Sequence, residues 1–142
     1  MKKIIAIFIL TLLSLPSYAF FWKKKEKPSL FLSSSNPSIT ISYDEKINNE
    51  DIFKIRRRIY FLIYNPEGFK SDYIKYQVFK QDDKVHVGGY SRIRNITRKV
   101  NNKNYYIDYF VLSEAGKYGL QIFDIENLHH WIAFAHFIVV EE

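Results

Sequence analysis

Residues 114–124 read E-A-G-K-Y-G-L-Q-I-F-D, a tight turn followed by a strand pattern. Because the side chains of a β-strand alternate between its two faces, Tyr118, Leu120 and Ile122 share one face. Gly116 stands just before the strand, where a corner needs a residue without a Cβ atom. The stretch therefore predicts a corner that leads into a strand with one buried apolar face.

The rest of the chain repeats this strand pattern at short, regular spacing. Further strands are expected at residues 29–32, 39–43, 56–64, 73–80, 85–87, 90–97, 105–112 and 131–140. Turn residues such as Asn65-Pro66-Glu67-Gly68 separate them, and no long helix or internal repeat is present in the pattern. Many short strands without helices are typical of a β-sandwich or a barrel.

Residues 131–140 are apolar on both faces of the expected strand. A strand of this kind is central in a sheet or lies against a partner. A buried helix is the alternative for this segment, but the β-branched residues Ile138, Val139 and Val140 favour a strand.

The spacing acid-x-Gly-x-Tyr-x-apolar, formed by Glu114, Gly116, Tyr118 and Leu120, resembles the tyrosine corner of immunoglobulin-like β-sandwiches. In that family the tyrosine hydroxyl forms a hydrogen bond back across the corner. The resemblance implies that these four residues anchor the fold. It also implies an all-β, antiparallel immunoglobulin-like or fibronectin-like sandwich of about 7–9 strands.

Leu120 stands where the family has its second cysteine, and the resemblance implies that Ile59, Phe61 or Ile63 stands where it has the first. The tryptophan that packs on the antibody disulfide is missing, and Tyr76 is the nearest substitute. These departures exclude an antibody-type domain and leave the wider architecture, which hosts many unrelated functions.

Residues 1–19 have the pattern of a signal peptide: two lysines, an apolar run, and Ser17-Tyr18-Ala19 as a cleavage motif. Cleavage is expected between Ala19 and Phe20. An uncleaved membrane anchor is the alternative, because lysines follow directly after this site and positive charge resists translocation. The sequence thus predicts a periplasmic or secreted protein, with the membrane close to the N-terminal tail.

Three segments follow from these boundaries: a signal peptide at 1–19, a basic and aromatic tail and linker at 20–37, and a β-sandwich domain at 38–142 whose first strand could begin at Ser29. The chain has no cysteine, so no disulfide can hold the domain. From Pro28 onward it has 15 basic and 14 acidic residues, a net charge of +1. A nucleic-acid-binding domain would carry a larger excess, and no nucleic-acid partner is expected.

Two groups of residues are candidates for partner binding. Arg92 and Arg94, with the arginine run 56–58, could form a basic face, although solvated edge strands that resist aggregation carry the same residues. Tyr105 and Tyr106 belong to a strand in a tyrosine-rich chain, and exposed tyrosine suits protein or glycan contacts as well as packing on a sheet.

No catalytic, cofactor or metal site is expected. His129 and His130 are adjacent, so they point to opposite sides of a strand, and no ligand spacing recurs. Asp108 lies inside an apolar strand, where an outward-facing or arginine-paired aspartate is expected rather than a catalytic one. The sequence therefore predicts a non-enzymatic interaction module of the cell envelope that binds another protein through edge strands or a tyrosine-rich sheet face. A binding domain for an acidic polymer or glycan is the alternative.

Overall fold

The computed structural model describes residues 26–37, 49–82, 89–101 and 103–142. Eight strands form in these ranges: β1 (Ser29–Ser33), β2 (Ile52–Lys54), β3 (Arg58–Tyr64), β4 (Tyr73–Gln81), β5 (Tyr90–Lys99), β6 (Tyr105–Val111), β7 (Gly116–Asp124) and β8 (Ala133–Val140). The all-β class and the strand number are confirmed. None of the described residues belongs to a helix that is long and apolar enough to cross a membrane.

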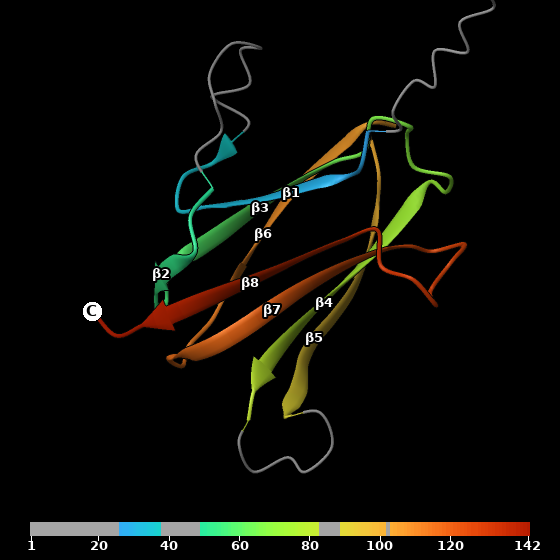
Figure 1. Cartoon of the computed structure of the whole chain (residues 1–142). Coiled ribbons are helices and arrows are strands. Elements are labelled where there is room, and N and C mark those ends of the chain that lie inside the picture. Colours follow the sequence, from blue (N-terminus) through green and yellow to red (C-terminus); the bar gives the residue numbers. More distant parts are fainter. Residues whose placement is uncertain (1–25, 38–48, 83–88, 102) are drawn as a thin grey trace, which may run out of the picture.

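The strands form two sheets that face each other (Figure 1). One sheet has three strands in the order β1-β3-β6, and the other has five in the order β2-β8-β7-β4-β5. All neighbours are antiparallel except β2 and β8, which run parallel. The prediction of a wholly antiparallel sandwich is therefore wrong for this one short edge pairing.

The core lies between the inner faces of the two sheets and contains one apolar residue from every second position of the central strands. From β3 it takes Ile59, Phe61 and Ile63; the facing sheet contributes Ile74, Tyr76, Val78, Tyr118, Leu120 and Ile122. The predicted alternation in β7 is thus confirmed, because its three inward residues are almost completely buried.

The strand predicted at 56–64 begins two residues later, because the backbone turns at Arg56, whose φ is 57°. The N–H of Ile55 still donates to Val140, but the N–H of Arg56 donates to Leu112 near the three-stranded sheet. This corner carries the chain from β2 in one sheet to β3 in the other. The strands predicted at 39–43 and 85–87 lie outside the described residues.

At the start of β7, the Tyr118 hydroxyl donates a hydrogen bond of 2.7 Å to the backbone carbonyl of Glu114. The ring stacks on Phe137 with 5.6 Å between centroids. Burial raises the pKa of Tyr118, so the hydroxyl keeps its proton for this bond. Gly116 has a φ of 154°, and a Cβ atom there would lie 3.0 Å from the Lys80 side chain. The bond that the tyrosine-corner pattern predicts is therefore present.

We expect Tyr118→Phe to lower the free energy of unfolding by about 1–3 kcal/mol, because the ring stays and the acceptor of a partly buried hydrogen bond loses its donor. Urea unfolding with constant m-values measures this change. Tyr105→Phe is the matched control, because Tyr105 is 41% exposed and its hydroxyl can bond to water. Equal stability of Tyr118→Phe and the wild type would show that the corner bond does not hold the turn.

Candidate protein-binding surface

Four tyrosines gather on the outer face of the three-stranded sheet. They form two cross-strand pairs, Tyr64 with Tyr105 and Tyr60 with Tyr109. Tyr64, Tyr105 and Tyr109 are 41%, 41% and 43% exposed. We call these four residues, with Arg58, the tyrosine face.

Arg58 orders one end of the tyrosine face. Its guanidinium carbon lies 4.6 Å from the centre of the Tyr109 ring, in a cation–π contact. One of its nitrogens, Nη1, lies 3.4 Å from the Tyr60 hydroxyl. The rings of Tyr60 and Tyr109 are 5.6 Å apart between centroids. The three side chains therefore form one stacked group on the surface.

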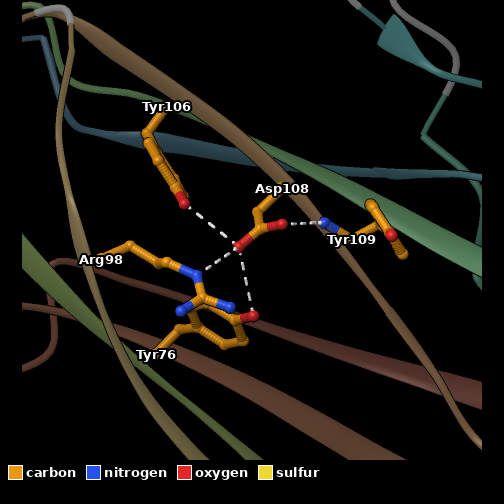
Figure 2. A network of polar contacts seen from close by, with 5 residues as sticks. All are labelled: Tyr76, Arg98, Tyr106, Asp108 and Tyr109. Carbon is orange, nitrogen blue, oxygen red and sulfur yellow. Dashed lines mark hydrogen bonds and ion pairs between the residues drawn. The ribbon is translucent and has the colours of Figure 1, made fainter.

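Directly beneath this face, the Asp108 carboxylate accepts four hydrogen bonds (Figure 2). Oδ2 accepts from the hydroxyls of Tyr76 and Tyr106, at 3.3 and 3.1 Å, and from Nε of Arg98 at 3.3 Å. Oδ1 accepts from the backbone N–H of Tyr109 at 2.8 Å. Four donors, one of them a cation, satisfy a half-buried carboxylate.

These contacts join the two sheets, because Asp108 belongs to β6 whereas Tyr76 and Arg98 belong to β4 and β5. Arg94 of β5 adds a second link, with Nη2 2.7 Å from the carbonyl of Val111 at the end of β6. Both β5 and β6 are edge strands. The polar links therefore fix the edge strand that presents Tyr105 and Tyr109 on its other side.

Burial, followed by the negative charge of Asp108, raises the pKa of Tyr76 to about 12. The same two causes, in the same order, raise the pKa of Tyr106. Both phenols therefore remain protonated donors to Asp108 at every pH at which an ordinary tyrosine does.

Of the two predicted partner-binding tyrosines, the structure places only Tyr105 on the surface. Tyr106 is its neighbour on the strand and points to the opposite face, where it is half-buried and bonded to Asp108. Tyr106 is therefore not part of the tyrosine face. The prediction of an arginine-paired Asp108 is confirmed by its ion pair with Arg98.

Arg92 and Arg94 do not share a face, because a bulge interrupts the pairing of β4 with β5. Arg94 lies opposite Val78, which faces the core, whereas Arg92 lies opposite Phe79, the next residue on β4. Successive residues of a strand point to opposite faces. Simple alternation along β5 groups the two arginines on one face, and this interpretation of the sequence is wrong.

The pairing of Tyr60 and Tyr64 with β6 was not apparent from the sequence, although both residues are conspicuous in it. Register between β3 and β6 depends on tertiary packing across a long stretch of chain. The alternation of tyrosine with buried residues in β3 is the one local signal that places both rings outside.

No protein-family model matches the sequence, and a search of the curated proteins gives no match. Solved structures resemble the fold weakly. A superoxide reductase (neelaredoxin) from Ignicoccus hospitalis has 7% identity over 83% of this chain and 82% of its own, with a TM-score of 0.42. The CARDB domain of the PF1109 protein from Pyrococcus furiosus, solved in complex with di-metal ions, has 17% identity over 82% of this chain and 94% of its own, with a TM-score of 0.39. The DNA glycosylase AlkC of Pseudomonas fluorescens has 8% identity over 80% of this chain and 30% of its own, with a TM-score of 0.43.

These comparisons correct one expectation, that the protein is not an enzyme. Two of the similar structures are superoxide reductases, and the expectation is withdrawn. TM-scores of 0.42 and 0.40 carry no argument for that reaction in this chain. Within the ranges that the structure describes, no three His, Asp or Glu side chains are grouped to hold a metal ion.

Because Tyr76 and Tyr106 have raised pKa values, we expect the folded protein to lose stability at high pH. The unfolded chain ionises its tyrosines near pH 10, but folded Tyr76 keeps its proton until about pH 12. The unfolded state therefore binds fewer protons in this window, and stability falls as pH rises from 10 to about 12. Urea midpoints across this range, compared with those of Tyr76→Phe, measure the effect.

In Tyr76→Phe the fall should be shallower, because one of the phenols with a raised pKa is absent. Tyr73→Phe serves as the control, since Tyr73 is 45% exposed and its hydroxyl can bond to water. If the urea midpoints of the wild type and Tyr76→Phe fall in parallel with pH, the raised pKa of Tyr76 is contradicted.

Proposed function

We propose that the protein is an exported immunoglobulin-like interaction module of the cell envelope, periplasmic or secreted, and that it binds another protein through the tyrosine face. The observation that carries the proposal is the gathering of three exposed tyrosines and Arg58 on one sheet face. Tyrosine and arginine are the residues that contribute most often to binding energy at protein interfaces.

The strand order supports an immunoglobulin-like assignment. In that family strands A, B and E lie in one sheet and C, F and G in the other. Here β1, β3 and β6 have the places of A, B and E, and β4, β7 and β8 those of C, F and G. The fifth strand, β5, then has the place of C′ in variable-type domains.

The packing around the missing disulfide gives further support. Leu120 of β7 is buried two residues after the corner tyrosine, where the family has a cysteine. Tyr76 of β4 packs edge-on against Phe61 of β3, with 4.9 Å between ring centroids. An aromatic contact between these strands thus replaces the tryptophan and the disulfide.

The composition of the tyrosine face suits a protein partner. The outward positions of β1, β3 and β6 carry no acidic residue, and Arg58 is their only basic one. Interface centres have few charged residues and many aromatic ones. The outer edges of β1 and β6 border this face. Leu32, Tyr109 and Val111 already have hydrogen-bond partners there, so a partner that adds a strand would pair with the remaining backbone groups.

Site-specific photo-crosslinking in intact cells tests this proposal. A photoreactive phenylalanine at Tyr105 or Tyr64 should give a discrete adduct with one envelope protein, because a bound partner covers these rings. The same probe at Tyr73 is the control, since Tyr73 is similarly exposed but belongs to the other sheet.

Adding Tyr109→Ser to the Tyr105 probe should reduce the adduct, because it removes the ring on which Arg58 rests. Diffuse labelling at Tyr105, or an adduct of equal yield at Tyr73, would refute binding through the tyrosine face.

A further inference from the structure

The outer face of the five-stranded sheet carries basic side chains but no acidic ones on its strands. Its outward positions follow from the register of β2, β8, β7, β4 and β5. The charged residues at these positions are Lys54, Lys75, Arg92, Lys99 and Lys117. These are five of the fifteen basic residues from residue 28 onward, and no acidic residue offsets them at the outward positions of these strands.

None of these five side chains forms an ion pair with another described residue. The ion pairs found in the described ranges involve Arg57, Lys80 and Arg98 instead. Asp51 precedes β2 and borders the face near Lys117 and His136, around a cavity of about 330 Å³. The five cations are therefore available to an anionic partner, because the neighbouring acidic residues, such as Asp51, Asp72 and Glu141, stand beyond the strand ends rather than on the strands.

A stripe of exposed apolar side chains runs along β8 on the same face, interrupted by the exposed His136 between Phe134 and Ile138. Ile138 lies between Ile52 of β2 and Lys117 of β7. Phe134 covers Gly119, where a Cβ atom would come within 3.1 Å of its ring. Trp131 follows, 6.1 Å from Phe134 between ring centroids and 56% exposed. Val140 continues the stripe at the other end.

We propose that this basic and apolar face docks on a membrane surface that contains anionic phospholipid. Lysine and arginine are attracted to anionic headgroups, and each adds about fivefold to the binding constant near such a surface. Exposed tryptophan and aliphatic side chains enter the boundary between headgroups and acyl chains. The face thus combines the two interactions that interfacial binding uses.

An anionic polysaccharide fits this face less well, because it would leave the stripe from Trp131 to Val140 in water. Contiguous exposed apolar side chains mark interaction sites. Docking here goes beyond the proposed protein contact, because the tyrosine face lies on the opposite side of the sandwich. One module can therefore lie on the membrane and hold a protein at the same time.

Cosedimentation with lipid vesicles tests the proposal, with the protein as recovered from the envelope. The expected result is binding to phosphatidylcholine vesicles that contain phosphatidylglycerol, and weak binding to phosphatidylcholine alone. Lys99→Gln with Lys117→Gln should weaken binding by roughly 25-fold, which is fivefold for each charge. Lys70→Gln with Lys103→Gln is the matched control, because it removes the same charge from exposed positions elsewhere.

Tryptophan fluorescence supplies a second readout. In a Trp22→Phe background, Trp131 is the only tryptophan, and its emission should shift to the blue on anionic vesicles. Circular dichroism confirms that each variant is folded.

Two results would overturn the proposal. In one, both lysine pairs lower vesicle binding equally, so that net charge rather than this face decides. In the other, the protein binds heparin in a way that depends on Lys99 and Lys117 but does not cosediment with the anionic vesicles. Neither result changes the crosslinking expected at Tyr105. The membrane proposal can therefore be refuted while the protein-binding proposal stands, and the reverse.

Discussion

The Asp108 carboxylate joins the two sheets, because it lies on β6 and accepts hydrogen bonds from side chains of β4 and β5. It lies on an edge strand, yet it receives hydrogen bonds from the neighbouring tyrosine of its own strand and from two strands of the other sheet. A chain without cysteine cannot hold its sheets with a disulfide, so they rely on the core and on such contacts. Leaving this carboxylate unpaired would be costly, because a half-buried charge needs its donors.

The alternation of side chains along a strand distributes roles to the two sides of each sheet. In β6, Tyr106, Asp108 and Phe110 face inward, and Tyr105 and Tyr109 face outward. The same rule separates buried Tyr118 from exposed Lys117 on β7. One strand thus contributes to the core, to the link between sheets and to a binding surface at once.

Local pattern predicted the fold class well, because it depends on alternation and turn residues within short segments. The corner at Tyr118 is an example. Its hydrogen bond joins two residues only four positions apart, so both partners lie within one short sequence pattern. The parallel pairing of β2 with β8 could not be predicted in this way, since Ile52 and Ile138 are far apart in the chain. The turn at Arg56 escaped prediction because a non-glycine residue adopts a positive φ there.

The candidate surfaces were predictable only in part, for the same reason. The abundance of tyrosine is a property of the sequence, but the pairing of Tyr64 with Tyr105 depends on register across the sheet. The bulge between Val78 and Phe79 places Arg92 on the same sheet face as Lys75 and Lys99. The sequence of β5 contains no residue from which this bulge could be predicted. The net charge of the domain, which is close to zero, therefore does not reveal that one of its faces is basic.

A double-mutant cycle at Asp108 and Arg98 tests the link between the sheets most directly. Asp108→Asn, Arg98→Gln and the double variant are compared by urea unfolding. We expect a coupling free energy of about 1 kcal/mol, at the low end for contacting residues because Arg98 is half-exposed. We also expect faster amide hydrogen exchange in β6 for each single variant. Additive effects, with unchanged exchange in β6, would show that the carboxylate does not hold the two sheets together.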